Sequence, residues 1–212
     1  MLSKNLFKRN FCAFQTTKAI HDTHIKYTVH NYAAPKKVAF ERGSGLYLYD
    51  IEGNKYVDCF AAATVVNQGH CHPKIRDAML KQAKQLTLTS RAFYTDKLGL
   101  WEKRITEQFG YDKVIFMNGG TEGAETSIKF ARRWAYDVKK VEDNKAVVLF
   151  PLENYWGRSI AGAASSEDPV RRDNFGPLKG FGFDLVEYNN VSALEEKFKS
   201  NPNIAAYVVE PI

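Results

Sequence analysis

A glycine-rich turn at residues 117–126 has residue types whose spacing suits the binding of one phosphate group. Gly119 and Gly120 let the backbone approach a ligand closely, and Thr121 adds a hydroxyl group. The free amides of a first helical turn point at such a ligand together with the positive end of the helix dipole. The same glycines also fit an ordinary tight turn, so the segment alone leaves both interpretations open.

The turn matches neither of the two common nucleotide-binding patterns, G-x-x-x-x-G-K-[ST] and G-x-G-x-x-G. Glu122 and Glu125 suit the helix dipole but repel a second anionic group. We therefore expect a single phosphate ester here rather than a triphosphate.

Alternating strands and helices are expected to position this turn. The apolar run 114–117 predicts a strand before it, and small or apolar residues recur at helical spacing over 124–135. Beyond these, the pattern predicts strands at 146–150, 184–188 and 204–210 and a helix at 192–200. Such alternation favours an α/β fold with a mostly parallel sheet, where ligands gather at the carboxyl ends of the strands. Segments 155–158 and 210–211 fall at such ends too.

Residues 21–72 predict an arm of short strands and turns instead of a helical domain. Two alternating runs, 46–50 and 55–58, flank Gly53 and Asn54 and predict a hairpin. Helices are expected at 74–86 and 96–109.

The composition is that of a globular protein. The chain has 212 residues, 44% of them hydrophobic, enough for one domain or one domain with an arm. Cys12, Cys59 and Cys71 form an odd set without framework spacing, which indicates reduced thiols in a non-secretory compartment. No run is long enough for a membrane span, and basic residues are dispersed among acids, so neither membrane nor nucleic acid is expected as a partner.

The first twenty residues differ from the rest, because they contain four basic residues, no acid and interleaved Leu and Phe. They account for four of the six net positive charges. This composition predicts a mitochondrial transit peptide over residues 1–20 and a location in the mitochondrial matrix. A basic tail without a targeting role is the alternative.

Five separated segments together resemble a known family: His-Asn-Tyr at 30–32, Val-Asn-Gln-Gly-His-Cys-His-Pro-Lys-Ile at 66–75, Leu-Thr-Leu-Thr-Ser-Arg-Ala-Phe-Tyr at 86–94, Asn-Tyr-Trp-Gly-Arg at 154–158 and Val-Val-Glu-Pro-Ile at 208–212. They are similar to the ornithine aminotransferases, class III members of the fold type I enzymes that depend on pyridoxal 5′-phosphate (PLP). The resemblance implies an amino-terminal arm over 21–85 and an incomplete large PLP-binding domain over 86–212.

The resemblance also implies a ligand for the glycine-rich turn. Gly120 and Thr121 would hold the phosphate of PLP, while Gly119 shapes its approach. Tyr155 matches the aromatic residue that stacks on the pyridine ring, with Trp156 beside it at the cofactor. A core aromatic beside Trp156 is the alternative for Tyr155.

Three further residues would face the substrate by the same resemblance. Arg158 matches the residue that holds the α-carboxylate, for which a guanidinium fork is well shaped, although an arginine after Trp-Gly also suits a plain surface position. Tyr32 matches a position near the α-amino end of ornithine. Glu210 is a candidate for the polar network around cofactor and substrate.

The sequence departs from the family at two places. Ala63 stands where the family has a tyrosine that helps to recognise ornithine, which leaves 4-aminobutyrate or acetylornithine open as the amino donor. The phosphate loop has Gly-Gly-Thr where Thr-Gly-Val is usual, a change that still offers amides and a hydroxyl. His70-Cys71-His72 could suggest a metal site, but no second cluster completes a tetrahedral set and the family's loop is structural.

The resemblance places a Schiff-base lysine, and an acid at the pyridine nitrogen, beyond the Glu-Pro-Ile segment. None of the lysines present stands in that sequence context, so no catalytic residue is assigned. Two hypotheses follow. These residues are the amino-terminal half of a homodimeric mitochondrial enzyme acting on an amino acid and a 2-oxo acid, inactive alone. Alternatively, a natural short product serves as a non-catalytic partner of a full-length subunit.

Overall fold

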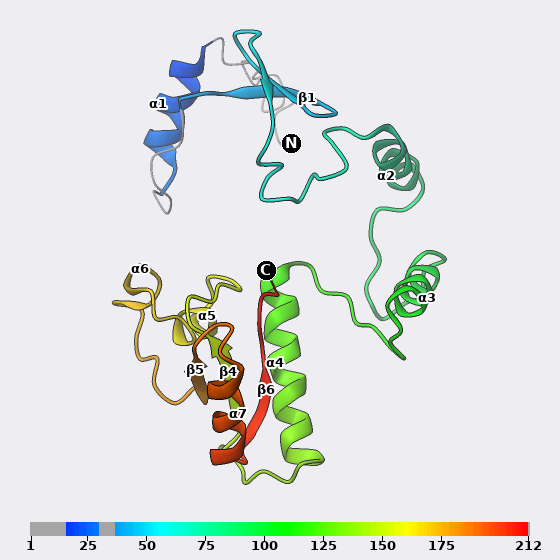
Figure 1. The fold of residues 1–212 in the computed structure, drawn as a ribbon. Coiled ribbons are helices and arrows are strands. Elements are labelled where there is room, and N and C mark those ends of the chain that lie inside the picture. The colour runs from blue at the N-terminus through cyan, green and yellow to red at the C-terminus, as the bar shows by residue number, and fades with distance from the viewer. Residues whose placement is uncertain (1–15, 30–36, 212) are drawn as a thin grey trace, which may run out of the picture. The chain divides into compact units, whose positions relative to one another are not determined.

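The computed structural model describes residues 16–29 and 37–211 (Figure 1). The chain forms two compact parts, which we call the amino-terminal unit (Met1–Thr95) and the carboxy-terminal unit (Asp96–Ile212).

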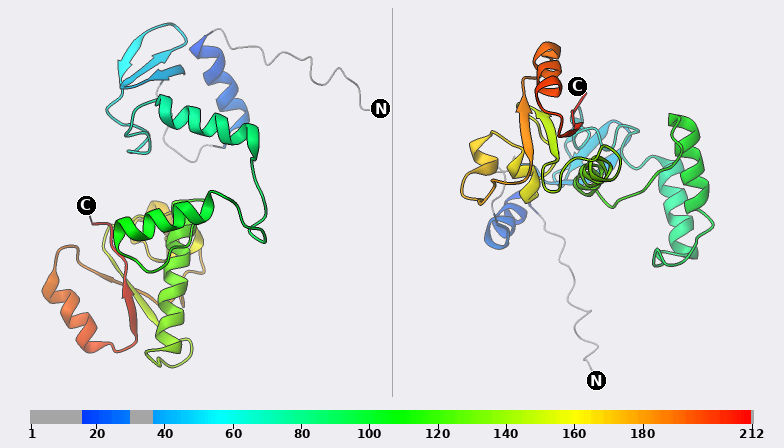
Figure 2. Two further views of the ribbon diagram at one scale, coloured as in Figure 1. Left: turned by 90° about the vertical axis from the view of Figure 1, so that its right-hand side faces the viewer. Right: turned by 90° about the horizontal axis from the view of Figure 1, so that it is seen from below.

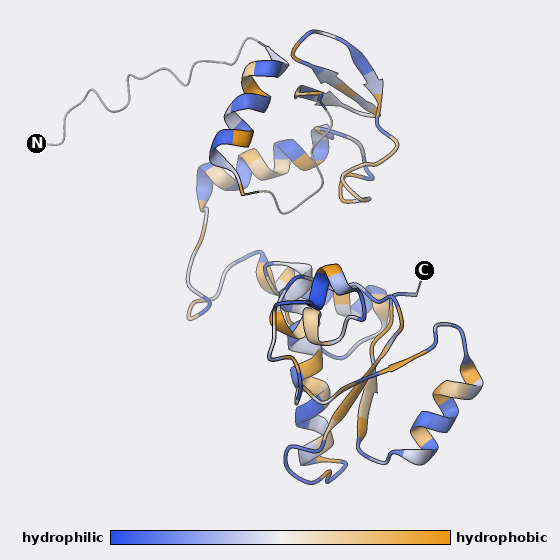
Figure 3. Ribbon diagram, turned by 90° about the vertical axis from the view of Figure 1, so that its left-hand side faces the viewer, coloured by the Kyte–Doolittle hydropathy of each residue, from blue (hydrophilic) through white to orange (hydrophobic). Residues whose placement is uncertain are grey.

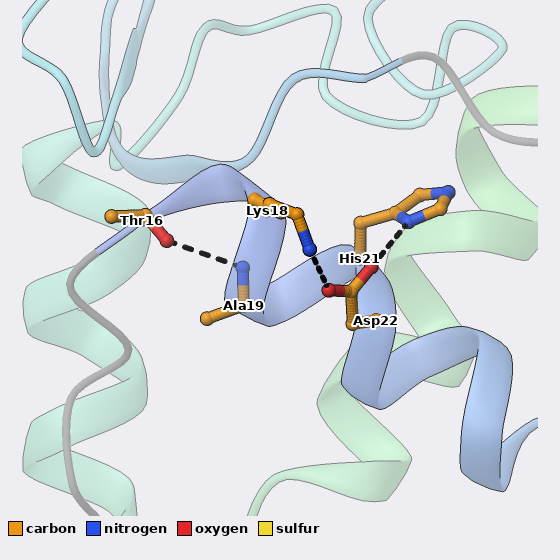
Figure 4. Close-up of polar contacts among 5 residues, drawn as sticks. All are labelled: Thr16, Lys18, Ala19, His21 and Asp22. Atoms are coloured by element: carbon orange, nitrogen blue, oxygen red, sulfur yellow. Dashed lines mark hydrogen bonds and ion pairs between the residues drawn. The ribbon is translucent and has the colours of Figure 1, made fainter.

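The amino-terminal unit begins with helix α1 (Thr17–Tyr27). The Thr16 hydroxyl accepts a hydrogen bond from the Ala19 amide at 3.2 Å and so caps the helix. In the same part of the helix, Lys18 and Asp22 form an exposed i,i+4 ion pair at 2.5 Å (Figure 4). The expectation of strands and turns alone after residue 21 was therefore wrong at its start, since capping and i,i+4 pairing favour a helix there.

An antiparallel sheet follows in the order β1 (Phe40–Ser44), β2 (Tyr47–Asp50), β3 (Lys55–Val57). The predicted hairpin is confirmed, because Tyr47 pairs with Val57 and the connecting turn contains Gly53 at φ +89°. A left-handed residue in a tight turn favours glycine. The sheet is thus specified by its own short-range turn chemistry.

Asp50 is the buried polar centre of this hairpin. Its carboxylate accepts bonds from the Asn54 amide at 2.7 Å, the Asn54 side chain at 2.9 Å and the Tyr56 hydroxyl at 2.8 Å. Burial raises the pKa of Asp50, but these donors outweigh it and the net pKa lies below the ordinary value. The bond to Asp50 in turn raises the pKa of Tyr56.

The two predicted helices are confirmed as α2 (Pro73–Gln85) and α3 (Leu98–Phe109). Proline in the first turn of α2 suits a position whose amide has no helical partner. Gly110, at φ +72°, ends α3 in the left-handed conformation typical of a helix C-cap.

The carboxy-terminal unit contains a parallel sheet in the order β5 (Phe183–Val186), β4 (Val147–Pro151), β6 (Ile204–Tyr207). The α/β fold with a parallel sheet and an amino-terminal hairpin is confirmed. Central β4 is almost wholly buried, which explains its unbroken apolar sequence. Figure 3 shows hydrophobic residues concentrated along the strands of this sheet.

Helix α4 (Gly120–Asp137) packs along β6 and β4, as the views in Figure 2 show. Two short helices, α5 (Ile160–Ala164) and α6 (Pro169–Arg172), follow β4, and α7 (Val191–Ser200) lies beside β5. The core between sheet and helix consists of Ile128 of α4 with the β4 residues Val148 and Phe150. This packing fixes the position of α4 relative to the ends of the strands.

The expected strand at 114–117 was wrong. These residues have no assigned strand structure and no strand partner among the described residues. An apolar run becomes a strand only when a neighbour completes its ladder of hydrogen bonds. Phe116 instead stacks on Trp101, with ring centroids 6.4 Å apart. The last predicted strand also ends earlier than expected, at Tyr207.

Within residues 16–29 and 37–211, the helices are all too short or too polar to cross a lipid bilayer.

Candidate functional site

The amino-terminal end of α4 presents free backbone amides to open space. Gly119 precedes the helix in an extended conformation and gives it no side-chain cap. A Cβ atom added at Gly119 or Gly120 would meet nothing within 4 Å. The first amides therefore keep their hydrogen-bonding capacity for a ligand, and the helix dipole favours a negative one.

Glu122, in the first turn of α4, is turned back toward the preceding residue. Its Oε2 atom accepts a hydrogen bond from the Asn118 amide at 2.9 Å. The carboxylate is therefore bonded to the backbone that precedes the helix. This bond resembles the one that the acidic residue makes in a capping box.

The loop after β4 reaches the same end of α4. Gly157 has φ +148°, a conformation that L side chains rarely adopt. A Cβ atom there would clash with the Thr121 hydroxyl oxygen and come within 2.8 Å of its methyl carbon. Glycine is thus required by both backbone and space. The contact brings together two segments that the sequence separately predicts at the cofactor.

Tyr155, just beyond β4, is bonded to a residue that lies just beyond β6. Its amide donates to Oε1 of Glu210, just beyond β6, at 2.5 Å. Tyr155 as a whole is 43% exposed. The Tyr188 hydroxyl, beyond β5, donates to the Glu210 carbonyl at 3.1 Å. The ends of all three strands therefore converge on Glu210.

Arg171 lies over the Tyr155 ring, with its guanidinium carbon 4.7 Å from the ring centroid. The same guanidinium donates to the Asn154 carbonyl at 3.3 Å and pairs with Asp168 at 3.1 Å. Arg171 is not among the residues predicted for the site from the sequence. Nothing in the local pattern of α6 indicates that its arginine reaches an aromatic ring in another loop.

Trp156 points into the core of the unit. Its ring stacks on Phe150, with centroids 5.8 Å apart and planes at 12°, and its Nε1 donates to the Ser165 hydroxyl at 2.8 Å. These contacts anchor the loop that contains Tyr155. Its role at the cofactor stays a prediction, and the contacts observed are those of a core aromatic.

Arg158 is exposed at the end of the same loop. The structure thus brings Gly119, Gly120, Thr121, Tyr155, Arg158 and Glu210 to the carboxyl-terminal edge of one sheet. Tyr32 lies outside the described residues.

The His70-Cys71-His72 segment belongs to the amino-terminal unit. His70 Nε2 lies 2.6 Å from Asp58 Oδ2, while His72 is the N-cap residue of α2. Within the described part of the chain, no group of three or more His, Cys, Asp or Glu side chains gathers as metal ligands would.

Residues 28–212 match the aminotransferase class-III family. Because the match covers most of the chain, the protein belongs to the class III aminotransferases.

Within this family the similarity is to ornithine aminotransferases. A probable mitochondrial ornithine aminotransferase of Caenorhabditis elegans is 51% identical over 197 residues, which make up 93% of this chain and 46% of that protein. A crystal structure of ornithine aminotransferase from Toxoplasma gondii superposes with a TM-score of 0.91 at 40% identity, and the match covers the whole chain but 49% of that protein. The acetylornithine aminotransferase of Elizabethkingia anophelis, at 38% identity over 94% of this chain and 45% of its own, has a TM-score of 0.77. The chain spans about half the length of these relatives.

Proposed function

We propose that the end of α4 binds the phosphate of PLP and that these residues form part of an ornithine aminotransferase. The complete enzyme would move the δ-amino group of ornithine to 2-oxoglutarate, giving glutamate semialdehyde and glutamate. One observation supports this most directly: Gly157 packs on Thr121, so that the predicted phosphate turn and aromatic loop meet at one edge of the sheet. In the T. gondii enzyme, PLP partially occupies the active site.

Each residue has a role that its observed placement permits. The amides of Gly120 and Thr121 donate to phosphate oxygens, and the Thr121 hydroxyl adds a further donor. Tyr155 supports the flat ring of PLP, and Arg158 binds the substrate carboxylate with its two parallel donors. Glu210 orients the Tyr155 loop through the backbone amide. PLP itself, when bound, supplies an electron sink for the reacting carbon.

The remaining catalytic groups would lie in the part of the relatives that this chain does not match. That part makes up 54% of the C. elegans protein, since 46% is matched. We infer that residues 1–212 alone bind PLP but do not transfer amino groups. The complete enzyme would act as a homodimer in the mitochondrial matrix, directed there by the basic residues 1–20. The reading frame beyond Ile212 tests this: a continuation that supplies a lysine and an acid supports it, whereas a stop codon backed by transcripts favours a non-catalytic partner.

The identity of the amino donor is the most specific part of the proposal. Ala63 stands in place of the family tyrosine, yet the relatives reported above include both ornithine and acetylornithine enzymes. We propose ornithine as the donor and use Ala63→Tyr as the test. Added ring area and a hydroxyl should raise the preference for ornithine over 4-aminobutyrate and acetylornithine in the complete enzyme. An unchanged ratio of kcat/KM values would show that residue 63 does not select the donor.

The phosphate site can be tested on the chain without turnover. We expect PLP to bind more tightly than pyridoxal, which lacks the phosphate, in a fluorescence titration. Thr121→Ala should weaken PLP about fivefold by removing one hydrogen bond, and should leave pyridoxal unchanged. Thr121→Ser, which keeps the hydroxyl, is the matched control. Equal affinity for PLP and pyridoxal would overturn the site.

Arg158 offers a second test in the complete enzyme. Arg158→Ala should raise KM for the amino acid more than it weakens PLP, because the guanidinium is assigned to the substrate carboxylate. Equal losses would make Arg158 a structural residue.

A further inference from the structure

Four consecutive residues of the amino-terminal unit, none of them glycine, have left-handed backbones. Their φ angles are +48° at Ala61, +52° at Ala62, +55° at Ala63 and +71° at Thr64. For L-residues this conformation is disfavoured, because it brings Cβ too close to the following carbonyl oxygen. A run of this kind persists only where surrounding contacts impose it, and such runs concentrate at functional sites.

Asp58 contacts the start of this left-handed segment. Its Oδ1 atom accepts hydrogen bonds from the amides of Phe60 at 3.0 Å and Ala61 at 2.9 Å. Its Oδ2 atom lies 2.6 Å from Nε2 of His70. The carboxylate therefore uses one oxygen to hold the beginning of the loop and the other to hold its end.

Both ends of the loop are fixed to the same part of the hairpin. The Asp58 amide donates to the Leu46 carbonyl at 2.9 Å. His70 exchanges two backbone hydrogen bonds with Gly45, at 3.0 and 2.8 Å. A Cβ atom at Gly43 would lie 2.8 Å from the His70 Cβ, so the histidine is seated directly on the strand. Loop 59–69 is thereby closed against β1 and the turn after it.

The Asp58–His70 pair is largely shielded from solvent. The two side chains are only 10% and 19% exposed, respectively. The pKa of Asp58 is held below its ordinary value, first by the Ala61 amide, then by His70 and the Phe60 amide. Asp58 is thus an anion throughout the neutral range, and its hydrogen bonds are charge-assisted.

We propose that Asp58 and His70 are positioning residues, which hold residues 61–64 in the left-handed conformation and thereby fix the backbone at Ala63, the position that the proposed function assigns to the choice of amino donor. The part that concerns the donor rests on the proposed function. Neither residue acts on the substrate itself. Their effect is exerted through the backbone that they clamp.

Amide hydrogen exchange on the 212-residue chain tests the clamp itself. His70→Ala should raise exchange at amides 60–66 about tenfold, while the β2–β3 amides keep their protection. His70→Gln, which can still donate to Asp58, should restore most of it. His72→Ala, two residues away at the N-cap of α2, is the matched control. Unchanged exchange in the loop, or equal loss in loop and hairpin, would overturn the clamp.

Steady-state kinetics of the complete enzyme test the positioning role. His70→Ala should raise KM for the amino donor about fivefold, with KM for 2-oxoglutarate and PLP affinity unchanged and with recovery in His70→Gln. Faster loop exchange with an unchanged donor KM would refute positioning. Absence of transferase activity in the complete wild-type enzyme would refute the proposed function and the donor role together, while the exchange result would still decide on the clamp.

Discussion

The two units of this molecule are stabilised by different kinds of contact. In the described part of the carboxy-terminal unit, nine hydrophobic residues are buried, among them Val148, Leu149 and Phe150 at 0% exposure. In the described part of the amino-terminal unit, the one buried residue is a carboxylic acid, Asp50, at 3% exposure. One unit has an apolar core, and the other is organised around polar side chains.

The difference shows what each unit can specify by itself. Apolar burial stabilises in proportion to area and needs no particular direction, so the sheet and α4 form a stable platform for the candidate phosphate site. Hydrogen bonds to a carboxylate are directional, so Asp50 and Asp58 define local geometry. We therefore expect the amino-terminal unit to be the more easily opened of the two.

The largest effect is expected from a substitution in the apolar core of the carboxy-terminal unit. Phe150→Ala should cost about 3–5 kcal/mol in the free energy of unfolding of the carboxy-terminal unit, because it empties the centre of the core. Tryptophan fluorescence reports on this unit alone, since all three tryptophans lie in it. Phe175→Ala, which truncates a ring that is 53% exposed, is the control. A loss below about 1 kcal/mol would show that burial at β4 is not what holds the unit together.

A smaller effect is expected where the core supports the site. Gly157→Ala should cost about 1–3 kcal/mol, since it combines a disfavoured φ with a clash against Thr121. PLP binding should weaken with it. Gly99→Ala, at a glycine with open space around it, is the matched control. Unchanged stability would mean that the loop after β4 is free to move away from α4.

The polar side of the comparison is tested at Asp50. Asp50→Ala removes the acceptor for Asn54 and Tyr56, so β1–β3 amides should exchange roughly tenfold faster. Tryptophan-detected unfolding of the other unit should not change. Asp77→Ala, which removes an exposed ion pair with Arg76, is the control. Destabilisation of both units alike would contradict independent stabilisation.

The smallest expected effect is a difference between the two units in how acid changes their stability. The pKa values of Asp50 and Asp58 are lowered in the folded chain, so their stabilisation is fully present above the unfolded value of about 3.9. It is lost as the pH falls below that value through the folded pKa. Exchange corrected for intrinsic rates should therefore increase in the amino-terminal unit first. In an Asp50→Asn, Asp58→Asn double variant, exchange in the amino-terminal unit should depend less on pH. An equal response of both units to acid in the unsubstituted chain would contradict this prediction.

Much of the fold was predictable where short-range signals decide it. The hairpin follows from alternating residues around Gly53, and α2 and α3 follow from apolar spacing with proline or glycine at their ends. The run 114–117 has the same apolar character as β4, but strand formation depends on a partner, which the local sequence cannot reveal.

The candidate site was predictable as a set of residues but not as an arrangement. Thr121 and Gly157 are distant in sequence, so their contact depends on how α4 packs against β4. Arg171 and the Asp58–His70 pair left no local signal for the same reason. The left-handed run at residues 61–64 was equally hidden, because alanine and threonine have no preference for positive φ.

The order of the parallel sheet has a consequence for synthesis on the ribosome. Central β4 is translated before β5 and β6, both of which it needs as partners. Until they emerge, Val148, Leu149 and Phe150 have no sheet to join, and a nascent chain with such a segment is prone to aggregation. The strand that contributes most to the folded core is therefore the one that waits longest for its partners while these residues are being made.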